Sequence, residues 1–235
     1  MKTLLTTSWD DGHPQDLRLA ELLDQYGLTG TFYIPRASQR PTLAADQVRQ
    51  LGRRFEIGGH TLDHIYLGTV SDEQAHQQIA GCARWLSDLL GRQCKMFCPP
   101  GGQFSRRHLP MIAGAGFGGL RTVELLSLRA PRRVGGLAIM PTTVQAYAHG
   151  RSAYVRNALK RRSVTGLWRA ACRGDDWTAV ARRLLDRALA AGGVFHLWGH
   201  SWEIEQYQQW PRLEEVLRLM AGVASRAPCV TNSDL

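Results

Sequence analysis

Hydrophobic and polar positions follow two alternating patterns along the chain. Short runs rich in apolar residues are typical of buried strands, and between them lie stretches whose apolar residues recur every three or four positions, as in amphipathic helices. Strands that alternate with helices in this way predict a parallel sheet with crossover helices. The predicted strands are 3–9, 31–34, 55–57, 96–98, 116–122, 137–140 and 194–198, and the predicted helices are 14–27, 44–54, 71–90, 106–113, 151–172, 176–191 and 211–225.

Residues typical of helix ends support these boundaries. Ser71 with Gln74 three positions later predicts a capping box, and Gly91 predicts the end of the same helix. Residues 123–150 are irregular apart from the strand at 137–140. No internal repeat or low-complexity linker marks a boundary, so we expect one domain over residues 1–235.

The amino-acid composition excludes several classes of protein. With 44% hydrophobic and 21% charged residues, the chain can bury a sizeable core, which excludes a disordered chain, a collagen-like fibre and a disulfide miniprotein. No stretch approaches the ~18 consecutive apolar residues of a membrane span. The residues before Asp10 leave no room for a signal peptide, so we expect a cytoplasmic protein. Five widely spread cysteines argue against a disulfide framework and favour reduced thiols.

A net charge of +9 indicates an anionic partner. Seven Arg or Lys residues fall within 151–173, which contains no Asp or Glu. Such a stretch can bind a phosphate, a lipid headgroup or nucleic acid, or it can be a solvated helix face. No nucleic-acid recognition motif accompanies it. Nucleic acid is therefore not an expected partner, whereas peripheral contact with anionic lipid stays open.

Two carboxylates directly follow the first predicted strand, where folds of this kind carry their chemistry. Asp10 and Asp11 precede Gly12. Adjacent carboxylates repel each other, and such a pair is tolerated where a cation or a proton settles the charge. The alternative is an Asp-Asp-Gly surface turn.

Two histidines follow the third predicted strand. His60 and His64 are four residues apart, a spacing that on a helical turn lets both imidazoles reach one metal ion; two surface histidines can also share this spacing by chance. Two histidines and one carboxylate, with open positions for water, are typical of a hydrolytic or oxidative metal site rather than a structural one. The second carboxylate of the pair would then be free to act as a base.

The last predicted strand also carries histidines. Alternation places His196 and Trp198 on one face of this strand, and His200 lies just past its end. His200 is placed for a general acid. Both histidines can instead be packed and hydrogen-bonded, which is the interpretation we favour for His196. Trp202 and Glu203 would line the mouth of the site.

Together these segments resemble the polysaccharide deacetylase (NodB-homology) family of metal-dependent carbohydrate deacetylases. The family's first motif, Thr-Phe-Asp-Asp-Gly, matches residues 8–12, and its second, His-Ser/Thr-x-x-His, matches residues 60–64. The third, Phe-Arg-Pro-Pro-Gly in many members, corresponds to residues 97–101. The resemblance covers about residues 4–202. It implies an α/β fold, a deformed (β/α) barrel with about seven strands, and makes residues 1–235 a single catalytic domain.

The resemblance also implies a set of roles. Asp10 would be the general base and His200 the general acid, while Asp11, His60 and His64 would bind the metal. One divalent transition metal is implied, zinc first, with cobalt, nickel or iron as alternatives. Such an ion polarises the acetyl carbonyl and lowers the pKa of its bound water from ~15.7 towards ~7.

Two features depart from the family pattern. Cys98 stands where many members carry an arginine that holds the catalytic base, and a thiol cannot replace that ion pair. We expect Arg121 to take over, because it ends a predicted strand. The family's fourth, acidic-tryptophan motif has no clear counterpart. Residues expected to bind substrate or to support the site are Pro99, Gly101, Arg121, His196, Trp198 and Trp202.

The expected function is a metal-dependent N-deacetylase, a hydrolase of carbon-nitrogen bonds other than peptide bonds. Its substrate would be an N-acetylated sugar: a polysaccharide, a surface-polysaccharide precursor, or a nucleotide- or lipid-linked sugar. One alternative is an amidohydrolase that acts on a small non-sugar amide. Another is a non-catalytic polysaccharide-binding homologue, which would have no need for a base, metal ligands and an acid together.

Overall fold

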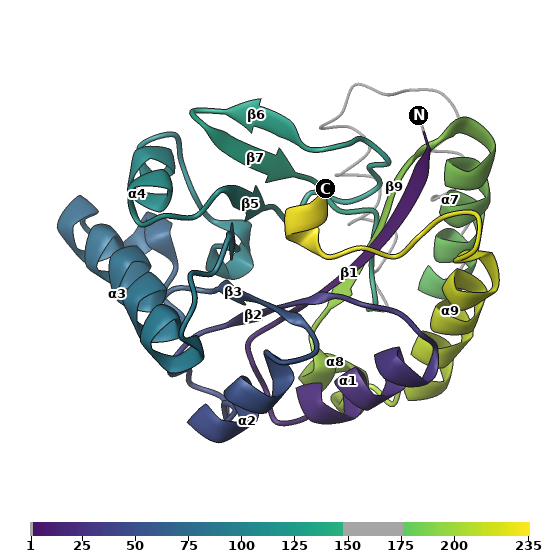
Figure 1. The fold of residues 1–235 in the computed structure, drawn as a ribbon, viewed down its shortest axis with the longest axis horizontal. Helices are drawn as coiled ribbons and strands as arrows, with labels where there is room; N and C mark the ends of the chain where they lie inside the picture. The colour runs from purple at the N-terminus through teal and green to yellow at the C-terminus, as the bar shows by residue number, and fades with distance from the viewer. Residues whose placement is uncertain (1, 148–175) are drawn as a thin grey trace.

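A computed structural model describes residues 2–147 and 176–235. The helix predicted over 151–172 and the basic stretch 151–173 lie outside the described residues. In the described part, nine strands form one sheet in the order β6-β7-β5-β4-β3-β2-β1-β9-β8. Figure 1 shows that the sheet curls and that helices lie around its outer side, with α3 and α4 at one end and α7 and α9 at the other.

The elements have the following bounds. The strands are β1 Thr3–Asp10, β2 Thr31–Ile34, β3 Glu56–Gly59, β4 Met96–Phe97, β5 Gly119–Arg121, β6 Arg132–Val134, β7 Leu137–Met140, β8 Val144–Gln145 and β9 Gly193–Gly199. The α-helices are α1 Asp16–Gln25, α2 Ala45–Leu51, α3 Asp72–Leu90, α4 His108–Gly114, α7 Trp177–Ala191, α8 Ser201–Gln206 and α9 Trp210–Val223. Three short 3-10 helices are η1 Leu67–Thr69, η2 Pro100–Gly102 and η3 Asn232–Asp234.

The strand pairing confirms the predicted fold class, an α/β protein with a deformed, partial barrel. Neighbouring strands pair in parallel from β8 through β9, β1 and onward to β5 and β7. Only β6, among the described strands, runs antiparallel, against β7. In such a sheet the carboxyl ends of all parallel strands meet at one edge.

Nine strands replace the seven expected, because the irregular region 123–150 contributes two more. A hairpin joins β6 to β7 through Gly135 and Gly136, whose φ angles of 57° and 85° suit a tight hairpin turn. The two residues of β8 pair with β9. Both additions are short and contain no run of apolar residues that would indicate a strand, and they depend on an existing neighbour for their hydrogen bonds.

Alternation along β1 separates the core from the site. Leu5 and Trp9 are buried in the core between the sheet and the helices. Ser8 and Asp10 lie on the opposite, inner side, where Ser8 contacts His196 of β9. The inner side of the sheet is therefore polar at the carboxyl end of β1, and the buried carboxylate of Asp10 lies there.

The C-terminal segment closes part of the inner side of the sheet, where η3 lies in Figure 1. Asn232 is buried, donates to Thr6 Oγ1 at 2.8 Å and accepts from the Tyr33 hydroxyl at 2.8 Å. Leu235 packs against a small inner cluster of buried residues, namely Tyr33, Met96, Cys98 and Met140.

The caps predicted for the longest helix are confirmed. The Ser71 hydroxyl accepts from the Gln74 backbone N–H, and the Gln74 side chain accepts from the Ser71 backbone N–H. Gly91 ends α3 in the left-handed region with φ 65°. Four cysteines in the described part, Cys82, Cys94, Cys98 and Cys229, are free thiols. Within the same residues, no helix combines the length and apolar character needed to cross a membrane.

Candidate metal centre and active site

A sharp turn after β1 brings both carboxylates to the carboxyl edge of the sheet. Asp11 has φ 79° and Gly12 has φ 58°. A Cβ at Gly12 would lie 2.7 Å from Ile34 Cγ2, so only glycine fits there. Asp10 and Asp11 are 2% and 5% exposed. This turn is therefore buried, and the surface-turn alternative is wrong.

His60 and His64 lie on an irregular loop after β3, which corrects the helical turn expected from their spacing. Thr61 and His64 have positive φ angles of 57° and 53°, a conformation that non-glycine residues adopt at a cost of about 1–3 kcal/mol each and that clusters at functional sites. Gln78 of α3 fixes the loop, since its side chain accepts from the Asp63 N–H and donates to Asp63 Oδ2, both at 2.8 Å.

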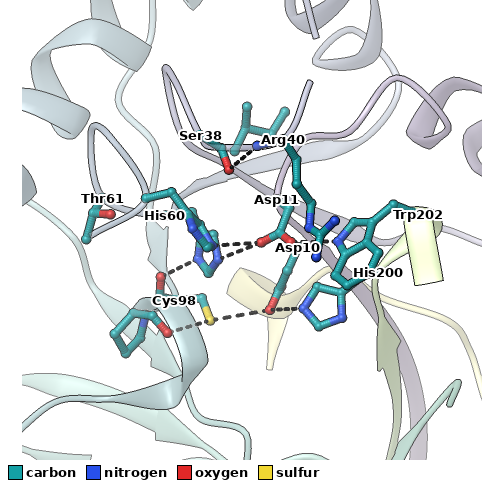
Figure 2. A network of polar contacts seen from close by, with 12 residues as sticks. Asp10, Asp11, Ser38, Arg40, His60, Thr61, Cys98, His200 and Trp202 are labelled. Atoms are coloured by element: carbon teal, nitrogen blue, oxygen red, sulfur yellow. Dashed lines mark hydrogen bonds and ion pairs between the residues drawn. The ribbon is translucent and has the colours of Figure 1, made fainter. Parts of the chain in front are cut away.

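The loop nevertheless directs both imidazoles at one carboxylate. Asp11 Oδ1 lies 3.3 Å from His60 Nε2 and 3.0 Å from His64 Nε2. Ligand atoms of the three residues all lie within 4.8 Å of one another. Figure 2 shows the His60 ring directed at the Asp11 carboxylate. These residues form the group that could hold a metal ion.

The donor atoms suit a cation. His60 Nδ1 lies 2.7 Å from the Cys98 carbonyl oxygen, which only accepts, so Nδ1 carries the proton. The other ring nitrogen, Nε2, faces Asp11 Oδ1 at 3.3 Å. A nitrogen and a carboxylate oxygen at this distance need a proton or a cation between them, because two lone pairs would repel each other. A backbone carbonyl that accepts from the other ring nitrogen commonly orients a metal-binding histidine.

The electrostatics of Asp11 agree with this arrangement. Burial raises the pKa of the Asp11 carboxyl, but hydrogen bonds from His60 and His64 and the positive charge of His200 outweigh burial and hold it well below its usual range. Trp202 donates from Nε1 to Asp11 Oδ2 at 2.7 Å. Asp11 is thus an oriented, ionised carboxylate, as a metal ligand requires.

Asp10 lies beside the candidate metal cluster and is held by Arg121. Arg121, at the end of β5, is fully buried and donates from Nη2 to Asp10 Oδ1. The guanidinium also lies against the rings of Trp198 and Tyr33, with Cζ 4.6 Å and 5.1 Å from their centroids. The Cys98 thiol lies 3.9 Å from Asp10 Oδ2. Arg121 is therefore the ion-pair partner of Asp10, the candidate base.

His200 lies on the other side of Asp10, because Trp9 and Gly199 are paired across β1 and β9, and Asp10 and His200 are the next residues after that pair. Its Nε2 is 4.0 Å from Asp10 Oδ2, and its Nδ1 is 2.5 Å from Glu203 Oε2. Burial lowers the pKa of His200, but the hydrogen bond to Glu203 and the charges of Asp11 and Asp10 raise it to about 9. His200 is therefore an imidazolium at neutral pH in the metal-free protein.

A buried hydrogen bond to α1 also holds the segment after His200. Ser201 donates to Asp16 Oδ1 at 2.5 Å, and both residues are fully buried. Burial, together with the negative charges of Asp11 and Asp10, raises the pKa of Asp16 well above its usual range. This contact joins the first turns of α1 and α8, and it fixes the backbone next to His200.

The remaining predicted residues lie around this centre. His196 is buried and contacts Ser8 Oγ through Nε2 at 2.8 Å. Burial, followed by the charge of Arg121, lowers the pKa of His196 to about 3, so this histidine is a neutral core residue. Gly101 has φ 60°, and a Cβ there would lie 2.9 Å from Tyr66 Cε1. Pro99 precedes η2 and accepts from the Gly102 N–H at 2.9 Å.

Sequence reasoning placed Glu203 only at the mouth of the site and did not assign Asp16 or Arg40 to it. Glu203 follows His200 by three residues, the spacing of neighbours on a helix, but α8 was not predicted because six residues are too few for a periodic pattern. Nothing in the sequence indicates that Asp16 or Arg40 lies near the two carboxylates.

A buried carboxylate pair and two histidines at the carboxyl edge of a curled parallel sheet define an α/β protein with a candidate metal-dependent active site. A family model described as polysaccharide deacetylase matches residues 2–119. The chain therefore belongs to the polysaccharide deacetylase family. The matched residues include both carboxylates, both histidines and Cys98, whereas Arg121 and His200 lie beyond them.

Individual proteins show the same relationship. A peptidoglycan-N-acetylglucosamine deacetylase of Bacillus cereus is 28% identical over 117 residues, which are 48% of this chain and 54% of that protein; the match thus spans about half the length of this relative. A Mycobacterium smegmatis protein assigned to the polysaccharide deacetylases has a TM-score of 0.70 at 17% identity, covering 97% of this chain and 87% of that one. Puue allantoinase has a TM-score of 0.72 at 12% identity, covering 99% and 87%. Both structural likenesses show the fold alone.

Proposed function

We propose that this protein is a metal-dependent N-deacetylase that removes an acetyl group from an N-acetylated sugar. The observation that carries the proposal is the position of Asp10 Oδ2. His200 Nε2 is 4.0 Å away from this oxygen, and the next residue in the chain, Asp11, belongs to the candidate cluster with His60 and His64. A base, a candidate metal cluster and an acid thus surround one point at the edge of the sheet.

Asp11, His60 and His64 would hold the metal ion, with zinc as the first candidate and cobalt, nickel or iron as alternatives. A divalent ion bound there supplies polarisation of the acyl carbonyl and a lowered pKa for an attacking water.

The chain's own residues divide the proton transfers. Arg121 engages Oδ1 of Asp10, so Oδ2 is the oxygen that accepts a proton from the attacking water. His200 donates its Nε2 proton to the departing amine, and Glu203 stabilises the imidazolium through Nδ1. Loss of this proton leaves acetate and the free amine as products. In each transfer the side chain that takes or gives the proton is held through its other polar atom: Asp10 by Arg121, and His200 by Glu203.

Elemental analysis tests the metal site. The parent protein is expected to contain one equivalent of a transition metal, and His60→Ala and His64→Ala are expected to lose it. His76→Ala is the matched control, because His76 is an exposed histidine of α3 outside the cluster. Absence of metal from the parent after incubation with zinc, cobalt and nickel would overturn the proposal.

Acetate release tests the reaction. Asp10→Asn is expected to lower turnover of an N-acetylated sugar by roughly 10² or more, with metal content unchanged, because the base is lost while the ligands remain. Hydrolysis of small non-sugar amides, with no release from any N-acetylated sugar, would instead identify an amidohydrolase. Binding of polysaccharide that is equal in the parent and Asp10→Asn, with no turnover in either, would identify a binding protein.

A further inference from the structure

A positive charge is positioned next to the candidate metal ligands. Arg40 lies on the loop between β2 and α2, and its Cζ is 3.5 Å from the centroid of the Trp202 ring. Trp202 in turn donates to Asp11 Oδ2 at 2.7 Å. Figure 2 shows the guanidinium against the indole, beside the two aspartates. One aromatic side chain thus links Arg40 to the centre of the site.

The stacked geometry leaves the hydrogen-bond donors of Arg40 available. A guanidinium that lies on an aromatic ring uses its face, and its five N–H groups remain in the plane. Two other arginines at this edge already have carboxylate partners: Arg36 pairs with Asp63 at 2.6 Å, and Arg121 pairs with Asp10. Over residues 2–147 and 176–235, no carboxylate forms an ion pair with Arg40.

Arg40 and a candidate metal ligand share one cavity. A cavity of about 510 Å³ is lined by Arg40, His64, Tyr66 and neighbouring residues of the two loops. Its volume lies within the range of small-molecule sites, about 300–1,000 Å³. Tyr66 is 43% exposed and offers an aromatic face along this wall. A molecule bound in the cavity would therefore reach His64 and Arg40 together.

We propose that Arg40 binds an anionic group of the substrate, a phosphate or a carboxylate, close to the acyl group that is removed. The planar fork of an arginine matches both anions with paired hydrogen bonds. The inference rests on the proposed function, because it assigns the substrate class of the same site. It makes Arg40 a specificity-determining residue and predicts an acidic or phosphate-linked sugar as the natural substrate.

Calorimetric titration of the metal-free protein at low ionic strength tests the proposal without turnover. Removing the metal prevents the anion from binding to the ion itself, and low salt limits screening of an exposed charge. The probes are uridine diphosphate, glucuronate and, as the neutral reference, glucose. Charged hydrogen bonds are worth about 1.5–3 kcal/mol, so Arg40→Gln is expected to weaken binding of the recognised anion roughly tenfold or more.

Arg53→Gln is the matched control. Arg53 is also exposed, but it precedes β3 and lies at the amino-terminal end of the strands. The control therefore removes the same charge from the opposite edge of the sheet, and it is expected to bind like the parent. Arg40→Lys keeps the charge without the planar fork and is expected to be intermediate. Because Arg40 is exposed, thermal melting of its variants should match that of the parent.

Each outcome has a defined meaning. A loss confined to uridine diphosphate assigns a phosphate, a loss confined to glucuronate assigns a carboxylate, and a loss for both assigns a general anion site. Binding that is equal in Arg40→Gln and Arg53→Gln, or a parent that binds neither anion, overturns the proposal. Failure of the deacetylase proposal would be visible separately, as missing metal or missing acetate release in the parent.

Discussion

The candidate base depends on a residue far away in the sequence. Asp10 ends β1, and Arg121, which ends β5, reaches it across the inner side of the sheet. Cys98 contributes little, because burial raises the pKa of its thiol well above the usual range and its Sγ is 3.9 Å from Asp10 Oδ2. The charge of Asp10 is therefore compensated mainly by Arg121, and the aromatic rings of Tyr33 and Trp198 hold that guanidinium in place.

Removing one partner of this buried pair should destabilise the protein. Arg121→Met is expected to lower the free energy of unfolding by about 3–5 kcal/mol, because it leaves a buried, uncompensated carboxylate. The double variant Asp10→Asn with Arg121→Met should regain part of that loss. Urea denaturation of the parent and the two variants measures both effects. Equal stability of Arg121→Met and the double variant would contradict a buried charge pair.

His200 should make the stability of the metal-free protein depend on pH. The pKa of His200 is raised from 6.5 to about 9, so the folded state favours the imidazolium. Its contribution is fully present below about pH 6.5 and is lost as the pH rises through about 9, with a size on the order of 3 kcal/mol. Glu203→Gln should shrink this loss. Urea midpoints between pH 6 and pH 10 in the presence of a chelator provide the measurement.

At the scale of elements, the loops carry the chemistry and the helices fix the loops. The loop with His60 and His64 has two positive φ angles and is held by Gln78 of α3. Ser201 at the start of α8 is held by Asp16 at the start of α1. Strained loop conformations persist where the surrounding structure determines them, so the stability of α3 and α1 is linked to the geometry of the site.

The end of α3 offers a test of how its cap stabilises the helix. Gly91 has φ 65°, where a Cβ costs about 1–2 kcal/mol. Gly91→Ala should lower the free energy of unfolding by about 1 kcal/mol, and Gly91→Asn by less, since asparagine tolerates the left-handed region. Gly114→Ala is the control, because Gly114 has no positive φ angle and open space at its Cβ. Thermal unfolding that is equal in all three variants would contradict the cap.

At the scale of the whole molecule, the curled sheet joins segments that are far apart in the chain. Asp11 follows β1, His60 and His64 follow β3, and His200 follows β9. The strand order places β1 between β2 and β9, with β3 and β4 beyond β2. A ligand that bridges these loops connects a large part of the sheet, so it should stabilise the folded state as a whole.

Metal binding should therefore raise the melting temperature. At a free zinc concentration about 100 times the dissociation constant, binding contributes about 2.7 kcal/mol. The chelator-treated parent should regain stability when zinc is added, and His64→Ala should not. His76→Ala, the histidine control outside the cluster, should respond like the parent. An equal response to zinc in His64→Ala and the parent would show that the ion binds elsewhere.

Much of the architecture was predictable from local patterns. The long strands β1 and β9 and the capped helix α3 follow from apolar runs and from Ser71, Gln74 and Gly91, since these signals depend on neighbours in the sequence. The motifs around Asp10 and His60 likewise identified the candidate cluster. The helical turn expected for His60 and His64 was wrong, because spacing defines a shared face only when the backbone is helical. Strands β6 and β8 were not predicted, because they are strands only through their hydrogen bonds to β7 and β9, which the local sequence does not reveal.

Local patterns along the chain account for the alternation of strands and helices, the family resemblance and the residue types of the candidate metal cluster. The groups that orient these residues are established only by the three-dimensional arrangement. Contacts of Arg121 with Asp10, of Glu203 with His200 and of Arg40 with Trp202 depend on the curvature of the sheet and on loop conformation. Hydrogen bonds and charge pairs act over a few ångströms in space, whatever the separation in sequence, so these partners become visible only when the strand ends meet at one edge.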